Sequence, residues 1–202
     1  MGKAWSLVVF FLWLGACGRP LPSVHEGDII FHTSNSNQSL AIQRATHSPY
    51  SHMGIVFFRD GKPFVMEAAA TVRYTPLEKW IRRGQGGHFV LKRLKDADTQ
   101  LSPAVIQKLH EVARQLEGRP YDLTFEWSDD RIYCSELVWK IYKRGAGIEI
   151  GSLQAVKDFD LEDPVVAAKM RERFGDKIPL IEPVISPAAM FESSLLKTVE
   201  EY

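Results

Sequence analysis

An Asp60-Gly61 turn between two apolar runs determines how the centre of this chain can fold. Asp-Gly between alternating apolar residues is a strong signal for a β-hairpin. We therefore predict two antiparallel strands that are joined by this turn. A two-residue turn makes His52 a diagonal neighbour of Glu67 on the same face, within reach of its carboxylate. From the hairpin alone, an ordinary polar pair at a strand end is the simpler explanation of these two residues.

Strand and helix signals follow each other along the rest of the chain. We predict strands over residues 28–31, 52–58, 63–69, 88–94 and 181–185. We predict helices over residues 36–46, 77–83, 102–117, 134–144 and 163–174, and a further helix start at Ser186-Pro187. Leu40 and Ile42 are expected to point inward, and Gly145 to end the helix over 134–144. With no repeat and no long linker, residues 24–202 are expected to form one α+β domain, an antiparallel sheet packed against helices.

Composition excludes several classes of protein. The 25 Lys and Arg residues balance the 25 Asp and Glu residues, so nucleic acid is not an expected partner. Hydrophobic residues make up 45% of the chain, which is too many for a disordered protein. Two cysteines are too few for a small disulfide-stapled domain. A globular domain, most simply an enzyme, remains.

Residues 1–17 are predicted to be a secretory signal peptide. Lys3 precedes an apolar run over residues 4–16, which is shorter than the about twenty residues that a membrane-spanning helix needs. The run from Leu14 to Cys17 (LGAC) resembles a bacterial lipobox, in which Cys17 would carry a lipid; ordinary cleavage after Gly18 is the alternative. We expect an exported protein, periplasmic or lipid-anchored to a bacterial envelope membrane. In either case Cys134 has no intramolecular cysteine partner.

Cys134 stands where a predicted helix begins. Apolar residues three, four, seven and eight positions after it place the thiol on the side that faces the sheet. The positive end of the helix dipole and the free N–H groups there favour a thiolate and could hold an oxyanion. Glu136 would oppose the thiolate if it pointed inward, and we expect it to point outward. A buried, inert cysteine remains the alternative.

Five segments in a fixed order carry a family resemblance: residues 27–31 (GDIIF), 46–56 (THSPYSHMGIV), 64–68 (FVMEA), 118–122 (GRPYD) and 133–140 (YCSELVWK). Together they resemble the permuted, NlpC-related branch of the papain-like cysteine peptidases and amidases, and within it the YiiX/YebB type of exported bacterial proteins. The resemblance runs from about Gly27 to the Ser186-Pro187 segment. It implies a circularly permuted papain-like (NlpC-type) fold with the catalytic cysteine at a helix N-terminus.

The resemblance also implies the roles of particular residues. Cys134 matches the family's nucleophile, His52 its base and Glu67 the residue that orients the base, while Tyr121 and Ser135 are candidates for substrate or oxyanion contacts. A thiolate–imidazole pair backed by a carboxylate is the pattern of acyl transfer through a thioester. For Tyr121, a structural role in the turn after Pro120 is an equal alternative.

The expected activity is hydrolysis of an amide or peptide bond, with a cell-wall peptide or a lipoprotein as substrate. A lipid-directed thiol acyltransferase or phospholipase on the same fold is the alternative, and a non-catalytic envelope binding module is a third hypothesis. The expected partners are a peptide, peptidoglycan-derived or acylated substrate and a membrane reached through the N-terminal lipid. No cofactor is expected, and no metal, because the remaining histidines lack paired ligand spacing. His32 is expected beyond the first strand, at the surface or behind the site.

Overall fold

The computed structural model describes residues 21–36 and 38–202, and its centre is an antiparallel sheet. The six strands of this sheet lie in the order β4-β3-β2-β1-β5-β8. They are β1 (Ile29–His32), β2 (His52–Arg59), β3 (Lys62–Ala68), β4 (Val72–Pro76), β5 (Val90–Leu94) and β8 (Leu196–Glu201). A separate short pair joins β6 (Gln154–Ala155) to β7 (Pro183–Val184). The α+β class and the antiparallel sheet are confirmed.

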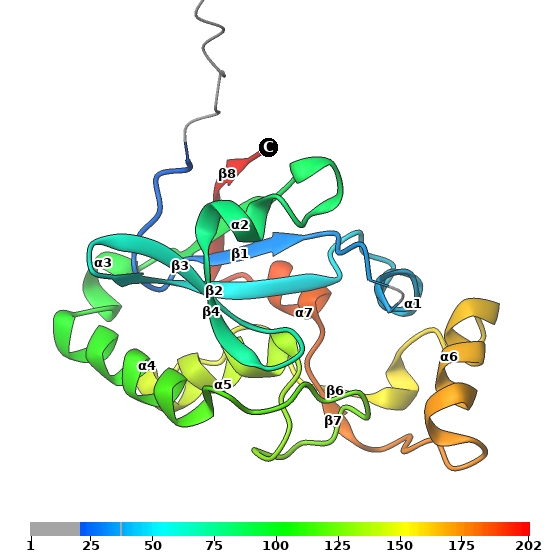
Figure 1. Ribbon diagram of the computed structural model, residues 1–202. Helices are drawn as coiled ribbons and strands as arrows, with labels where there is room; N and C mark the ends of the chain where they lie inside the picture. Colours follow the sequence, from blue (N-terminus) through cyan, green and yellow to red (C-terminus); the bar gives the residue numbers. More distant parts are fainter. Residues whose placement is uncertain (1–20, 37) are drawn as a thin grey trace, which may run out of the picture.

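Helices cover both faces of the sheet (Figure 1). The helices are α1 (Ser39–Thr46), α2 (Leu77–Ile81), α3 (Ala97–Gln100), α4 (Pro103–Leu116), α5 (Cys134–Ala146), α6 (Pro164–Phe174) and α7 (Pro187–Phe191). On one face α5 packs on β2 and β3, with α4 and α7 beside it. On the other face α2 contacts β3 and β4. None of the helices in the described part of the chain has both the length and the apolar character needed to cross a membrane.

The central hairpin has the register that the Asp60-Gly61 turn predicts. Ile55 faces Met66, and Phe57 faces Phe64. Asp60 and Gly61 have φ values of 50° and 71°, the left-handed conformation that a type I′ hairpin turn requires at both positions. His52 and Glu67 therefore share one face of the sheet, as predicted.

Alternation along the hairpin divides the buried apolar residues into two clusters. The larger cluster lies between the sheet and α4, α5 and α7, and it contains Met53, Ile55, Phe57, Met66, Ala68 and Cys134. The smaller cluster lies on the opposite face and is formed by Ile30, Val56, Val65, Leu77, Trp80, Phe89 and Leu91. The side chains of His52 and Glu67 belong to the face of this smaller cluster.

Two details of the predicted elements are wrong, and two strands were missed. Leu40 is 48% exposed, because α1 turns Ser39 and Ala41 inward instead. Gly145 does not end α5, which continues to Ala146 and is closed by Gly147 in the left-handed conformation. Gly145 instead allows α4 to approach, since a Cβ at this position would lie 2.7 Å from Leu109 Cδ2. The strands β4 and β8 were not predicted from the sequence.

Candidate functional site

Cys134 is the first residue of α5, directly after the N-cap Tyr133. Its thiol is buried, with 2% of the residue exposed, and belongs to the larger apolar cluster. The first N–H groups of a helix have no intrahelical partner, and together with the helix dipole they stabilise negative charge. The prediction that Cys134 stands at the start of a helix is therefore confirmed.

His52 and Glu67 are joined by a hydrogen bond of 2.7 Å between Nε2 and Oε2. His52 is the first residue of β2, and Glu67 is the sixth residue of β3. The His52 side chain is 13% exposed and that of Glu67 is fully buried. The bond to Glu67 occupies Nε2, so Nδ1 is the ring nitrogen left for another partner.

Glu67 is held by more donors than the hairpin alone provides. Oε1 accepts hydrogen bonds from Thr75 Oγ1 at 2.6 Å and from Arg83 Nη2 at 2.5 Å. Arg73 Nε lies 3.8 Å from the same oxygen. Burial opposes the charge of Glu67, but the bonds from His52, Arg83 and Thr75 outweigh it and lower the pKa of Glu67 to about 2. The carboxylate therefore remains ionised at neutral pH.

Both Cys134 and Glu67 affect the protonation of His52. Burial lowers the pKa of His52, but hydrogen bonds with Cys134 and Glu67 and the charges of both groups outweigh it and raise the pKa to about 9. The raised pKa of His52 and the lowered pKa of Glu67 thus favour a charged imidazolium beside a carboxylate. The structure brings together the three residues that the sequence indicates as nucleophile, base and orienting group.

An aromatic stack encloses the ring of His52. Trp80 of α2 is buried and stacks on His32 with a centroid distance of 4.0 Å, and it also lies 5.9 Å from the His52 ring. His32 faces His52 across the β1–β2 pair. The expectation that His32 lies beyond the first strand is wrong, since it is the buried last residue of β1. Burial lowers the pKa of His32 to about 2, which keeps this ring neutral beside the charged one.

Tyr121 is near the thiol with its hydroxyl oriented by a second residue. Gln38 Nε2 donates to Tyr121 Oη at 3.2 Å, so the phenolic proton remains available to another acceptor. Burial and the charge of Cys134 raise the pKa of Tyr121 well above its usual value, so the phenol stays protonated. Ser135 is differently placed, because its hydroxyl donates to the Ile185 carbonyl oxygen at 2.7 Å and ties α5 to the segment before α7.

Glu136 differs from the sequence-based expectation. Its side chain is buried rather than outward-facing, with Oε1 2.7 Å from Lys140 Nζ and Oε2 accepting the Tyr133 backbone N–H at 3.3 Å. Glu136 therefore caps the first turn of α5 from the buried side of the helix. Burial raises the pKa of Glu136 to about 7, although Lys140 acts in the opposite direction.

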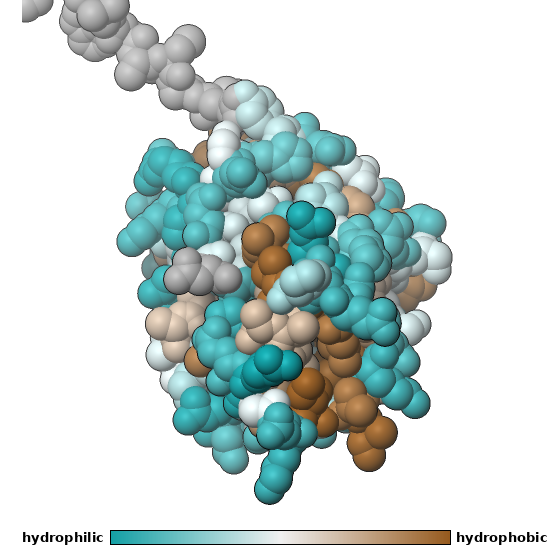
Figure 2. Space-filling model, turned by 90° about the vertical axis from the view of Figure 1, so that its right-hand side faces the viewer, coloured by the Kyte–Doolittle hydropathy of each residue, from teal (hydrophilic) through white to brown (hydrophobic). Residues whose placement is uncertain are grey.

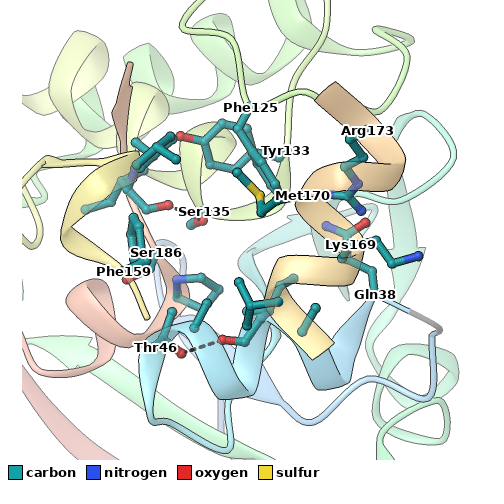
Figure 3. A pocket seen from close by; sticks show the side chains of 18 of the residues that line it. Gln38, Thr46, Phe125, Tyr133, Ser135, Phe159, Lys169, Met170, Arg173 and Ser186 are labelled. Atoms are coloured by element: carbon teal, nitrogen blue, oxygen red, sulfur yellow. Dashed lines mark hydrogen bonds between the residues drawn. The ribbon is translucent and has the colours of Figure 1, made fainter. Parts of the chain in front are cut away.

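Two hollows meet at the site. The first is an apolar cavity of about 100 Å³ that includes Cys134 and lies between α1 and α6 (Figure 3). Its apolar walls include Ala41, Ile42, Phe125, Val166, Met170 and Ile185. The second is a more open and polar groove that includes His52 and Arg83. Figure 2 shows the face of the molecule that carries α1 and α6, where apolar side chains form a band bordered by hydrophilic ones.

Several residues of this site were not predicted from the sequence. Thr75 comes from β4, Trp80 from α2 and Arg83 from the turn after α2, and Gln38 precedes α1. Of these residues, only Thr75 could have been assigned to a strand from the sequence, because residues 72–75 alternate between apolar and polar side chains. Cys17 lies outside the described residues. Among residues 21–36 and 38–202, no group of three or more His, Cys, Asp or Glu side chains could hold a metal ion.

Known proteins resemble this chain in both sequence and structure. Residues 23–200 match the family model of permuted papain-like amidase enzymes of the YaeF/YiiX type. The protein YiiX of Escherichia coli strain K12 is 50% identical over 173 residues, which cover 86% of this chain and 84% of YiiX. A crystal structure from Escherichia coli O157:H7, described as metalloprotein yiiX, has 49% sequence identity and a TM-score of 0.84, covering 88% of this chain and 97% of that one.

Proposed function

The chain belongs to the permuted papain-like amidase family, and we propose that it is a thiol hydrolase that cleaves an amide or peptide bond through Cys134, His52 and Glu67. One observation carries this proposal. The buried carboxylate of Glu67 accepts the Nε2–H of His52 at 2.7 Å, and Cys134 together with Glu67 raises the pKa of this imidazole to about 9. A thiolate activated in this way is the nucleophile that acyl transfer requires.

The first half of the reaction forms a thioester. The Cys134 sulfur attacks the carbonyl carbon, and a C–S bond forms while the carbonyl oxygen becomes an oxyanion. The phenol of Tyr121 and the N–H groups at the start of α5 are the donors placed to hold that oxyanion. His52 then gives its proton to the nitrogen as the C–N bond breaks, and the amine leaves.

The second half removes the acyl group. Water attacks the thioester carbon and gives a proton to His52, after which the C–S bond breaks and the carboxylic acid leaves. Glu67 accepts the Nε2–H throughout, which fixes the tautomer and stabilises the imidazolium. These steps use only groups of this chain.

The proposed substrate is a cell-wall peptide, a lipoprotein or another acylated compound of a bacterial envelope. We propose that the protein is exported to this envelope, where it is either periplasmic or anchored through a lipid on Cys17. The apolar cavity beside Cys134 favours the acylated members of this set. The same observation supports a second candidate, in which the acyl group comes from a lipid and passes to an acceptor other than water.

The test is to trap the acyl group on the enzyme. The protein is mixed with an envelope extract, quenched in acid, digested and examined by mass spectrometry for an adduct on the peptide that contains Cys134. Cys134→Ala is the control, and His52→Ala should form the adduct far more slowly because the thiolate loses its partner. A wild-type protein whose Cys134 reacts with iodoacetamide but never acquires an acyl group would refute the proposal and favour a binding module.

A further inference from the structure

The cavity and the groove are joined at the reacting pair. Cys134 lines the cavity but not the groove, and His52 lines the groove but not the cavity. Gln38, Ile42 and Tyr121 line both. A bound substrate that reaches both residues must therefore place one part in each hollow.

The order of bond making decides which part goes where. The acyl group stays on the Cys134 sulfur after the first step, so it belongs on the cavity side. The amine leaves after taking a proton from His52, so it belongs on the groove side. The substrate is thus oriented by two environments of different polarity.

The cavity fits a hydrocarbon chain. Val166, Met170 and Ile185 in its wall are each at most 8% exposed, so little of their surface is open to bulk water. Its two cationic residues, Lys169 and Arg173, lie with Gln38 on one side (Figure 3). Lys169 pairs with Glu172 at 2.5 Å, and the Arg173 guanidinium lies 5.2 Å from the centre of the Phe125 ring. Their aliphatic stems thus add to the apolar wall.

The groove fits an anion. Its lining contains Arg82, Arg83 and Arg131 and, among the described residues, no Asp or Glu. Arg82 and Arg83 pair with Glu78 and Glu67. Arg131 is exposed and forms no ion pair with any residue in the part of the chain that the structure describes. An arginine without a carboxylate at the rim of a groove can pair with a carboxylate of the substrate.

We propose that the substrate is an N-acylated amino acid or peptide: an aliphatic acyl chain occupies the cavity between α1 and α6, and an amine that carries a carboxylate occupies the groove beside Arg131. This inference rests on the proposed function and names its substrate class. The products are the free fatty acid and the amino compound.

The test compares a series of N-acylglycines, from acetyl to dodecanoyl, with the glycinamide of each chain. Release of the amine by the full chain is measured. We expect kcat/KM to rise about two- to fourfold for each added methylene until the cavity is full. The glycine series should be cleaved at least tenfold faster than the glycinamide series, because only glycine supplies the carboxylate.

Paired variants test whether the cavity determines the preference for chain length and the groove determines the preference for the carboxylate. Met170→Trp should shorten the preferred chain and Met170→Ala should lengthen it, while Val165→Trp, on the exposed side of the same helix, should leave it unchanged. Arg131→Gln should reduce the preference for the carboxylate, measured as the ratio of kcat/KM for each N-acylglycine to that for its glycinamide. Arg171→Gln removes the same charge from an exposed position that lines neither hollow and is the matched control.

The outcomes separate this inference from the proposed function. Cleavage that depends on Cys134 but not on chain length or carboxylate would overturn the inference and leave the proposed function intact. Faster cleavage of the glycinamides would also overturn it, since the amine would then not be an anion. If no acyl compound, including the activated ester p-nitrophenyl acetate, is cleaved in a Cys134-dependent way, the proposed function itself is wrong.

Discussion

Replacing Glu67 by Gln should reduce activity by roughly 10²- to 10³-fold, well beyond the effect of the lost charge. The charge of the acceptor is worth about 1–2 kcal/mol in its bond to the imidazolium, which corresponds to roughly ten- to thirtyfold in rate. The rest of the loss comes from the side of the carboxylate that faces away from His52.

The amide of Gln has one acceptor oxygen, whereas the carboxylate serves three donors. Thr75 and Arg83 donate to Oε1, and His52 donates to Oε2. Arg83 has only donors, so it excludes the NH₂ group from its side and draws the amide oxygen toward itself. A hydrogen bond to a charged donor is worth roughly 1.5–3 kcal/mol, so this orientation is favoured by about ten- to a hundredfold. It turns the NH₂ group toward His52 Nε2, which must then accept, and the proton moves to the wrong nitrogen.

Two assays measure this effect in a Cys17→Ser background, where Cys134 is the remaining cysteine of the chain. One is the rate of alkylation of Cys134 by iodoacetamide at pH 7, and the other is hydrolysis of an N-acylglycine. Glu78→Gln is the matched control, because it removes the same charge from an exposed residue of α2. Adding Arg83→Met to Glu67→Gln should restore about tenfold, since the amide can then present its oxygen to His52.

Two results would refute this reasoning. A Glu67→Gln protein within threefold of the wild type would show that Glu67 does not hold the ring. A large loss that Arg83→Met fails to relieve would show that the amide does not turn as argued, and that the charge alone, or misfolding, accounts for the loss.

Three further predictions concern pH, anchoring and register. Burial opposes both charges, but the bonds of the site raise the pKa of His52 to about 9 and lower that of Glu67 to about 2. The contribution of these two groups to stability should therefore be complete between pH 4.5 and 6.5. The His52 part should be lost as the pH rises from 6.5 through about 9, and the Glu67 part as the pH drops from 4.5 through about 2. Thermal unfolding measured against pH checks this, and a difference in stability between the wild type and His52→Gln that stays constant above pH 6.5 would contradict it. Cys17→Ser should move the protein from the membrane to the soluble fraction, and wild-type protein that is already soluble would exclude the lipid anchor. One residue inserted between Asp60 and Gly61 should shift Glu67 to the other face and cost at least as much activity as Glu67→Ala, provided that circular dichroism shows a folded protein; an insertion mutant that works normally would show that another residue holds the ring.

The part of the site that the sequence predicts is the part that local geometry determines. Two turn residues with positive φ fix the register of the hairpin, and the register alone brings His52 to Glu67. Likewise, Cys134 can be placed at a helix start because the apolar period after it is regular over two turns of α5. Both predictions need only neighbours along the chain or across one turn.

The remaining residues depend on packing between distant segments. Arg83 reaches Glu67 only because α2 folds back over the sheet, and nothing in the sequence near Arg83 indicates that direction. Glu136 was expected outside because charged residues are rarely buried, yet Lys140 one turn later lies in the same interior and pairs with it. Such pairing is visible only once the position of the helix is known.

The two halves of the site come from opposite faces of one sheet. Cys134 belongs to the apolar cluster beneath α5, whereas Glu67 and the stacked Trp80 lie on the face that α2 covers. His52 stands at the end of β2, where its ring can reach past the strand from one face toward the other. The reacting pair therefore exists only when helices have packed on both faces. Because neither cluster alone assembles the site, the formation of an activated thiolate should coincide with global folding and not with the ordering of the hairpin.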